Sequence, residues 1–358
     1  MTAALRADVA IVGAGITGLA SAERLTAHGA RVIVIDDSAT DAATLVSGGL
    51  IRAFDPAGAY ATWPVESCAR YLARGRHGSW PAVRRHGSLT LIDEGDLGRV
   101  TPRIEAVRGA GLPVEVLDAD DIAERHPQLT VPRHLVGVME PRAGWLPAAE
   151  TLQALHRDAG PGLRLLRARA LSLTHSSSRV QGVRTSGGAD VHADAVLLAA
   201  GVGSTPLAAS AGVDLPLRTR AVSYCLFRVE DTTGLPTLVD HTTGAWLRRW
   251  DTDRTVLAGV PSTRTDVPAR TRDGVDPAET ERVRAVVAQR FPQLAGATAV
   301  GGVTAYDAMV PAAGPGSVTS WPRPHGLVTA AGWNGGGFKI APAVGRQAAD
   351  HLLEALQR

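Results

Sequence analysis

The chain has 358 residues, with 37 lysines and arginines against 35 aspartates and glutamates, and a formal net charge of +2. This length can bury a large core and predicts about two domains. The near balance of charge, with no block of like charge, gives no indication of nucleic acid or a membrane surface as a partner.

The first predicted unit is Val9–Asp36, where an apolar strand, a glycine turn, a helix and a second apolar strand follow one another. Gly13 allows a tight turn, Gly15 lets a pyrophosphate touch the backbone, and Gly18 lets the helix lie against the strand. The helix N-terminus favours phosphate. Asp36, eighteen residues after Gly18, is placed to accept hydrogen bonds from ribose hydroxyls. The order predicts a dinucleotide site, and an ordinary βαβ unit is the alternative.

The same N-terminal stretch has some features of a secretory signal, namely Arg6, an apolar middle and a small-x-small ending. Asp8 interrupts that pattern, and an export signal does not require glycines at fingerprint spacing. No other apolar run approaches the roughly 20 residues that a membrane span needs. The two cysteines, Cys68 and Cys225, match neither a CxxC nor a metal-ligand pattern. We therefore expect a soluble cytoplasmic protein with reduced, buried thiols and no metal site.

Further along the chain, a helix over Ala148–Ala159 ends at Gly160-Pro161. Two strand-like segments, Arg164–Leu173 and Arg179–Thr185, precede the continuous apolar run Ala193–Gly201, which is typical of a strand buried on both faces. The character of the sequence then changes. Alternating and aromatic segments predict an antiparallel sheet, interrupted by one helix over Pro277–Phe291. The predicted strands of this sheet are Leu217–Val229, Ala245–Trp250, Thr255–Val260 and Ala299–Tyr306.

At the end of the chain, a buried strand over Leu327–Gly332 and a helix over Phe338–Leu356 return to the nucleotide-domain pattern. We therefore expect an α/β fold in which a Rossmann-type domain and an antiparallel-sheet domain are interleaved. The first would comprise residues 1–75, 141–215 and 326–358, and the second residues 76–140 and 216–325.

A second glycine cluster, GWNGGGFK at Gly332–Lys339, lies between that last strand and the C-terminal helix. Three glycines before a helix expose N–H groups at the positive end of its dipole. The first motif already accounts for a pyrophosphate, so this second site suits a different electron-rich group. The pyrimidine edge of a flavin fits, because reduced flavin carries negative charge near N1 and the C2 carbonyl. A flexible loop that caps the helix is the alternative.

Taken together, these motifs resemble the flavin-dependent amine-oxidising family that includes glycine oxidase, sarcosine oxidase and D-amino-acid oxidase. The resemblance implies FAD and a two-electron oxidation of a C–N bond, with hydride passing to flavin N5 and little need for a protein nucleophile. The stretches that carry it are VAIVGAGITGLASAERL, Ser47–Arg52 (SGGLIR), Gly87–Ile92 (GSLTLI), Val116–Leu129, Gly144–Thr151 (GWLPAAET), Asp194–Gly203 and Gly332–Gly345.

The resemblance also implies site residues. Arg52 and Lys339 match the basic residues that bind a substrate carboxylate in sarcosine-oxidase-like members. The planar guanidinium of an arginine and the compact ammonium of a lysine together suit the carboxylate of an amino acid. Further pocket candidates on the second sheet are Tyr224, Trp246, Arg248 and Tyr306. The cofactor-binding candidates are Gly13, Gly15, Ile16, Thr17, Gly18, Asp36, Asp37, Ser47, Gly48, Gly49, Leu50, Leu171, Ala200, Gly201, Gly332, Asn334, Gly335, Gly336, Gly337, Phe338 and Lys339.

Two positions depart from the family pattern. Thr304 aligns with the cysteine that binds flavin covalently in sarcosine-oxidase-like chains, and with the carboxylate-binding arginine of glycine-oxidase-like chains. We therefore expect non-covalent FAD and a missing anchor. Leu257 aligns with a lysine that assists oxygen use, which leaves oxygen or another carrier open as the electron acceptor.

Three other functions are compatible with parts of the sequence. A hydroxylase-type flavoprotein usually has a Gly-Asp flavin motif, which GWNGGGFK lacks, and an NAD(P) dehydrogenase does not need the second glycine cluster. Asp37 also stands where a chain that binds NADP often has an arginine. A non-catalytic flavoprotein subunit remains an alternative because the anchor at Thr304 is missing. The expected partner is a small amine or amino acid whose identity the sequence does not reveal.

Overall fold

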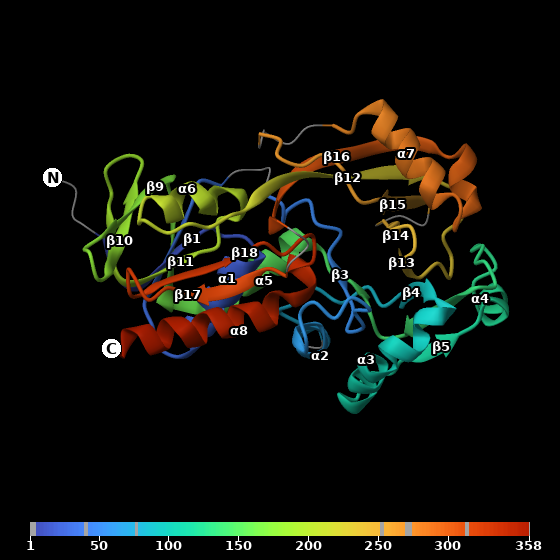
Figure 1. The fold of residues 1–358 in the computed structure, drawn as a ribbon, viewed down its shortest axis with the longest axis horizontal. Coiled ribbons are helices and arrows are strands. Elements are labelled where there is room, and N and C mark those ends of the chain that lie inside the picture. The colour runs from blue at the N-terminus through green and yellow to red at the C-terminus, as the bar shows by residue number, and fades with distance from the viewer. Residues whose placement is uncertain are drawn as a thin grey trace.

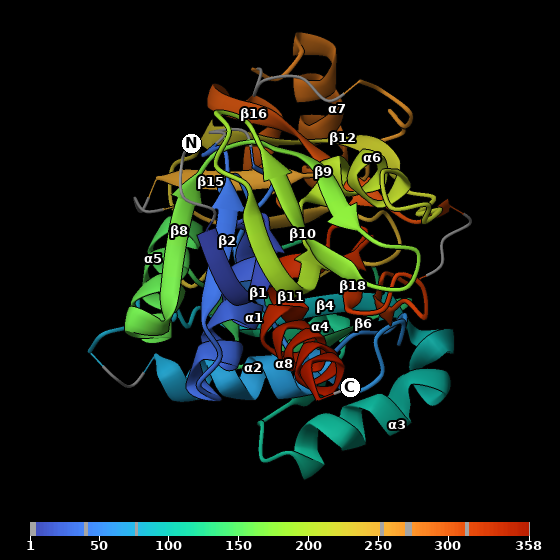
Figure 2. The same cartoon turned by 90° about the vertical axis from the view of Figure 1, so that its left-hand side faces the viewer.

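In the computed structural model, which describes residues 5–38, 42–75, 78–250, 254–268, 274–311 and 315–357, the first of two large sheets is mainly parallel. Its parallel part contains β1 (Leu5–Val12), β2 (Val32–Asp36), β8 (Leu163–Arg167), β11 (Val191–Leu198) and β18 (Leu327–Ala331). The antiparallel strands β9 (Ala170–His175), β10 (Val180–Thr185) and β17 (Ser317–Ser320) complete it. In the order β17-β18-β11-β1-β2-β8, only β11 separates β18, from near the end of the chain, from β1, from its start (Figure 2).

Both faces of this sheet are covered, which explains its continuous apolar strands. Helices α1 (Ile16–Ala27) and α8 (Gly337–Leu356) pack on one face, while β9, β10 and α6 (Ser204–Ala209) pack on the other (Figure 2). The two helices meet closely, because a Cβ on Gly345 would lie 2.6 Å from the Ala20 carbonyl carbon. The N-terminal and C-terminal helices therefore form one layer. Among the described residues, no helix combines the length and the apolar character needed to cross a membrane.

The second sheet is mostly antiparallel and lies beside the first (Figure 1). Its order is β16-β12-β15-β14-β13-β4-β6-β5, and only the pair β13–β4 is parallel among its described pairs. The strands are β4 (Ser88–Asp93), β5 (Glu115–Leu117), β6 (Leu135–Glu140), β12 (Arg218–Arg228), β13 (Thr237–Asp240), β14 (Trp246–Arg249), β15 (Thr255–Gly259) and β16 (Thr298–Met309). Helix α7 (Pro277–Val287) covers one face of this sheet through Val283 and Val287.

The remaining helices fill the space around the two sheets. Residues of α2, α3, α5 and β6 share one core with α1, which joins the two halves of the molecule. The helices of this core are α2 (Trp63–Arg74), α3 (Leu97–Gly109) and α5 (Ala148–Ala159). Helix α4 (Ala119–Arg125) instead packs through Ile122 into the core of the second sheet. A small two-stranded sheet pairs β3 (Leu50–Ile51) with β7 (Gly144–Trp145).

The predicted interleaved two-domain α/β fold is confirmed, with several local differences. The strand predicted over 164–173 is two strands, because Ala168 donates to the Asp36 carbonyl at the end of β8 and the chain then leaves to pair β9 with β10. The helix predicted to Phe291 ends at Val287. The second sheet contains one parallel pair, and β17 joins the first sheet although it lies within residues 216–325.

Candidate active site

Three glycine-containing turns lie at the same edge of the first sheet. Val12 and Leu198 end β1 and β11 and are neighbours in register, and Leu198 is in register with Thr329, two residues before the end of β18. The turns at Gly13, at Ala199–Gly201 and at Gly332 follow these strand ends directly. Ligands of open α/β sheets bind at the carboxyl ends of the strands. The structure therefore brings the front and rear glycine motifs to one edge of one sheet.

The first turn is a cradle that only glycine can build. Gly13 has φ +105°, and a Cβ there would lie 2.5 Å from the Ala199 carbonyl oxygen. A Cβ on Gly18 would lie 1.9 Å from the Gly13 carbonyl oxygen, so the helix and the turn touch through backbone alone. Gly15 begins α1 without a side-chain cap. These residues fit the diphosphate of FAD, because the turn before the helix N-terminus carries no side chain larger than the Ala14 methyl group.

Ile16 and Thr17 begin helix α1 and are both buried. The Ile16 amide donates to Thr44 Oγ1 at 3.1 Å, so Thr44 shapes this end of the helix. Thr44 lies in an irregular stretch that follows no recognisable motif, so the sequence did not indicate this residue.

The Asp36 carboxylate holds backbone at the end of β2. Oδ2 accepts a hydrogen bond from the Ala14 amide at 2.7 Å, and Oδ1 accepts one from the Ser38 amide at 2.7 Å. Asp36 therefore ties the glycine turn to the second strand, a role that the sequence did not indicate. Ala168 lies against the Asp36 backbone, whereas the candidate Leu171 is 54% exposed on β9. Asp37 is exposed next to Asp36.

Replacing Asp36 by alanine should weaken FAD binding by about 10- to 100-fold, because hydrogen bonds to a charged group contribute roughly 1.5–3 kcal/mol. Asp36→Asn, which keeps one acceptor oxygen, should lose less. The measurement is FAD titration of the apoprotein by fluorescence quenching. Equal FAD affinity in Asp36→Ala and the wild-type protein would show that this carboxylate has no part in cofactor binding.

The second glycine cluster is held from several sides. Tyr60 donates from its hydroxyl to the Trp333 carbonyl at 2.9 Å, and the fully buried Tyr71 donates to the Phe338 carbonyl at 2.9 Å. Asn334 has φ +52° and accepts a hydrogen bond from the Val310 amide at 3.1 Å. The sequence did not indicate either tyrosine, because both lie far from the cluster in the chain.

The start of α8 also lacks side-chain capping. Gly332 and Gly335 have positive φ angles of +83° and +86°, and Gly336 precedes α8 with no side-chain cap hydrogen bond. Gly337 is the first residue of the helix. The helix amides of this turn therefore face no capping side chain of their own.

Arg52 and Lys339 lie within one buried group of charges. Arg52 is 8% exposed and donates to the Phe54 carbonyl. Lys339 Nζ lies 2.7 Å from Asp55 Oδ2, and both side chains are 12% exposed. Glu140 accepts hydrogen bonds from the Ala53 and Phe54 amides at 2.6 and 3.2 Å. The structure thus brings the two predicted cations together and adds two carboxylates that the sequence did not reveal.

Burial and neighbouring charges shift the titration of this group. Burial and the Arg52 guanidinium lower the pKa of Lys339 to about 8. Burial raises the pKa of Glu140. Burial also acts to raise the pKa of Asp55, but the attraction of Lys339 and Arg52 is stronger and holds that pKa below its ordinary value. Burial and Arg52 lower the pKa of His241 to about 4, so His241 is neutral at pH 7.

The second sheet presents Arg248, Trp246 and Tyr224 on a single face. Arg248 pairs in register with Leu257, Leu257 pairs with Leu226, and side chains directly opposite share a face. Trp246 and Tyr224 are each two residues from a member of this row, so they share the face as well.

On this face, the Arg248 guanidinium lies over the Trp145 ring at 3.7 Å and the Trp250 ring at 4.8 Å, which is cation–π geometry. Arg248 Nε also donates to the Gly48 carbonyl at 2.7 Å. This hydrogen bond joins the second sheet to the SGGLIR segment, in which the Gly49 amide donates to Ser47 Oγ and Leu50 pairs with Trp145.

Tyr306 and Thr304 lie on the opposite face of β16 from Val303 and Ala305. Thr304 Oγ1 lies 2.9 Å from Ser223 Oγ and donates to the Gly274 carbonyl at 3.3 Å. Val303 and Ala305 instead pack with Val46 and Tyr224. The structure therefore does not bring Tyr306 or Thr304 together with Arg248 and Tyr224.

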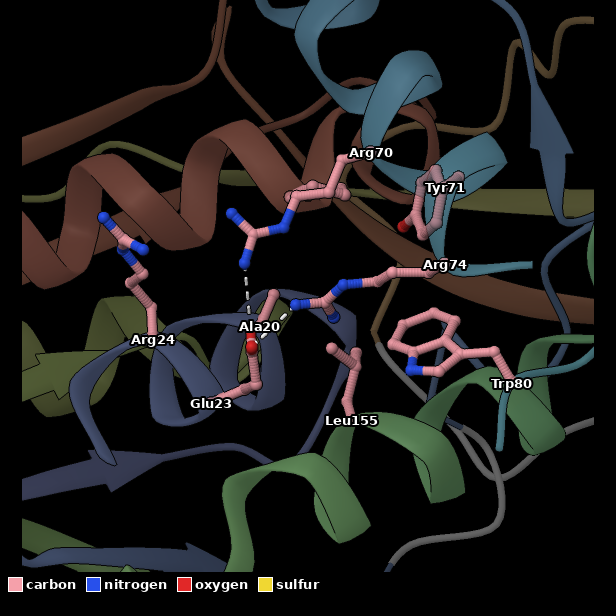
Figure 3. Close-up of a pocket in the computed structure, with 9 residues that line it drawn as sticks. Ala20, Glu23, Arg24, Arg70, Tyr71, Arg74, Trp80 and Leu155 are labelled. Atoms are coloured by element: carbon pink, nitrogen blue, oxygen red, sulfur yellow. Dashed lines mark hydrogen bonds and ion pairs between the residues drawn. The ribbon is translucent and has the colours of Figure 1, made fainter. Parts of the chain in front are cut away.

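The cavity drawn in Figure 3 does not suit a ligand. It lies between α1, α2 and α5, where Glu23 pairs with Arg70 and Arg74. Its volume is about 10 Å³, which is room for one water molecule at most. These arginines therefore serve to join the helices.

A larger recess of about 280 Å³ lies beside the buried charges, between Pro56, Ala57, the end of β4 and His241. Within the described part of the chain, no cluster of three or more His, Cys, Asp or Glu side chains is arranged to hold a metal ion.

Comparison with known proteins gives the family. The model of the DAO family, described as FAD dependent oxidoreductase, matches residues 8–351. Monomeric sarcosine oxidase from Bacillus sp. (strain B-0618) is 24% identical over 219 residues, which are 59% of this chain and 55% of that protein. D-amino-acid oxidase from Bradyrhizobium diazoefficiens is 36% identical over 118 residues, which are 32% of this chain and 28% of that protein. The chain thus spans about half of the first relative and about a quarter of the second.

Solved structures share the fold. Glycine oxidase from Geobacillus kaustophilus superposes with a TM-score of 0.80 at 23% identity, covering 98% of this chain and 95% of that one. L-proline dehydrogenase from P. horikoshii superposes with a TM-score of 0.85 at 19% identity, covering 98% and 94%. With the family model matching nearly the whole sequence, the chain belongs to the DAO family of FAD-dependent oxidoreductases.

Proposed function

We propose that this enzyme oxidises the C–N bond of a small amino acid, or of a secondary or cyclic amine carboxylate, to an imine. When bound, FAD supplies the chemistry by accepting a hydride at N5. The observation that carries the proposal is a pair of little-exposed cations: Arg52, which directly follows β3 and is 8% exposed, and Lys339, which is in the first turn of α8 and whose side chain is 12% exposed. The curated relatives support it, since they are named for sarcosine and D-amino acids.

In this proposal, Arg52 and Lys339 bind the carboxylate and orient the amine. Glu140 fixes the segment that carries Arg52 through two backbone amides, and Asp55 holds the Lys339 ammonium. Because the group is buried, water screens these charges little, so position and charge count for more than in solvent. An arriving carboxylate shares Lys339 with Asp55, since the ammonium has three donors.

We further propose that FAD is bound without a bond to cysteine. Cys68 is buried in the core around α2, and Cys225 is buried in the core under α7. Acid precipitation should therefore release all of the yellow flavin into the supernatant. Flavin retained in the protein pellet would contradict this expectation.

The electron acceptor is proposed to be a carrier other than oxygen, or oxygen used slowly. Leu257 is fully buried on the face that carries Arg248, and it offers no charge near the site. An ammonium at this place would stabilise reduced oxygen electrostatically, whereas an alkyl group does not. Rapid reoxidation of the reduced enzyme by air would contradict this proposal.

The test is an anaerobic screen of flavin reduction, in which the loaded protein is mixed with primary, N-methyl and cyclic amino acids. Loss of the visible absorbance of the bound flavin identifies a substrate class. Matched amines without the carboxylate should reduce the flavin far more slowly. A fully loaded protein that no amino acid reduces would instead favour the non-catalytic subunit.

A further inference from the structure

Arg220 and Asp307 form an ion pair where the second sheet meets the second glycine cluster. They are direct partners across β12 and β16, with Arg220 Nη2 3.4 Å from Asp307 Oδ2. Their strand positions place them on the face that carries Tyr224 and Val303. Neither residue has a role in the site described so far.

Both members of the pair lie against the turn at Gly335. The Gly335 amide acts on the Asp307 carboxylate in the sense that lowers its pKa, although burial raises that pKa overall. Arg220 Nη2 lies 3.4 Å from the position that a Cβ on Gly335 would take, so the guanidinium rests on a residue without a side chain. Two residues beyond Asp307, Met309 bridges to Trp333. The ends of the two strands thus pack directly on the loop over 332–337.

The positive charge of Arg220 is only partly offset by its partner. The contact to Asp307 is a single long one, not the two-pronged arrangement of a strong arginine–carboxylate pair. Arg220 Nε is buried and has no hydrogen-bond partner among the described residues. A guanidinium held in this way exerts a positive potential on the adjacent turn.

We propose that Arg220 and Asp307 together set the electron affinity of the flavin bound at the loop over 332–337. Two electrons and one proton from the amine leave one negative charge on the pyrimidine edge of reduced flavin. Arg220 stabilises that charge, and Asp307 limits the stabilisation. The inference rests on the proposed placement of the flavin ring at this loop.

The test measures the midpoint potential of bound FAD by equilibration with a reference dye. Arg220→Met should lower the preference for reduced over oxidised FAD about tenfold, which is about 30 mV for a two-electron couple. Asp307→Asn should raise it by a similar factor, and the double variant should lie near the wild-type value. Arg220→Lys, which keeps the charge, should retain most of the wild-type potential.

The matched control is Arg218→Met. Arg218 lies on the same strand but pairs with Asp266 and is 42% exposed, so its loss should leave the potential unchanged. If the pair were merely structural, both Arg220→Met and Asp307→Asn would weaken FAD binding, and their midpoint potentials would not shift in opposite directions. Titration of the apoprotein with FAD measures the binding separately. If Arg220→Met does not retain FAD, the midpoint potential of Asp307→Asn still tests the inference, because the proposal requires that potential to rise.

Lys339→Met separates the inference from the placement on which it rests, because Lys339 lies in the first turn of α8. A shifted potential in Lys339→Met with none in Arg220→Met and Asp307→Asn would overturn the role of the pair and keep the ring at the loop. Unchanged potentials in all three variants would overturn the placement as well.

Discussion

Replacing Arg52 by alanine should weaken the binding of a carboxylate inhibitor by about 10- to 1000-fold, because charge-assisted hydrogen bonds contribute roughly 1.5–3 kcal/mol or more. Arg52 is 8% exposed, so solvent cannot replace the lost guanidinium. The measurement is titration of the flavin spectrum with a small aliphatic carboxylate. Arg52→Lys keeps the charge but loses the planar fork, so it should show an intermediate loss.

The control for this prediction is Arg133→Ala. Arg133 pairs with Asp120 at the surface, and its side chain is 83% exposed, so its removal should leave inhibitor binding unchanged. Arg52 also donates to the Phe54 carbonyl, and the alanine variant therefore needs a thermal melt to show that the segment stays folded. Unaltered inhibitor affinity in a folded Arg52→Ala protein would remove the clamp from the proposed function.

Lys339 should give the same clamp a pH dependence. Its pKa is lowered to about 8, so the ammonium is present below pH 8 and is lost as the pH rises through that value. Carboxylate affinity should therefore be constant at lower pH and fall by up to about tenfold per unit above pH 8. Lys339→Met should bind more weakly and lack this step. Persistence of the step in Lys339→Met would assign it to another group.

Replacing Gly18 by alanine should abolish FAD retention. The new Cβ would lie 1.9 Å from the Gly13 carbonyl oxygen, which is backbone that cannot rotate away, and 3.3 Å from Ile11 Cγ2. Helix α1 must then move off the strand, and its amide end leaves the diphosphate position. Overpacking of this kind typically costs about 1–3 kcal/mol of stability as well. The ratio of flavin to protein absorbance after purification measures retention.

Gly98→Ala is the matched control for Gly18→Ala. Gly98 lies in α3 with no heavy atom within 4 Å of the added Cβ and no positive φ, so alanine should be neutral or slightly stabilising there. A thermal melt with and without added FAD separates a lost cofactor from a misfolded chain. Normal flavin content in Gly18→Ala would mean that the helix does not need backbone contact with the turn.

Periodicity alone predicted much of the architecture. The helix expected over Ala148–Ala159 has those bounds in the structure, the strands around 9–12 and 327–331 lie where their apolar runs indicated, and the strand-like segment Arg179–Thr185 forms β10. Such patterns depend on each residue's own burial, which composition reveals locally. The single strand expected over 164–173 failed because both of its halves are strand-like, and only their different partners separate them.

The site shows the same division. The sequence indicated Arg52 and Lys339 through motifs, but it gave no sign of Asp55 and Glu140, which have no motif of their own. Lys339 and Asp55 are 284 positions apart, and Ala53 and Glu140 are 87 positions apart. The sequence indicated Thr304 by alignment. In a strand, however, neighbouring residues point to opposite faces, so a shift of one residue changes the face. The register places Thr304 opposite Ser223, on the other face from Val303 and Ala305.

What the sequence determined by itself is the pair of glycine turns and the order of strands and helices, because steric freedom at glycine and the burial of apolar runs are local properties. What only the tertiary structure decided is the neighbourhood of each charge: which carboxylate holds Lys339, which face Arg248 shares with Tyr224, and that Arg220 and Asp307 rest on Gly335. Those pairings join segments that the chain keeps far apart: strand register brings together the residues of the second sheet, and the packing of α8 brings Lys339 to Asp55.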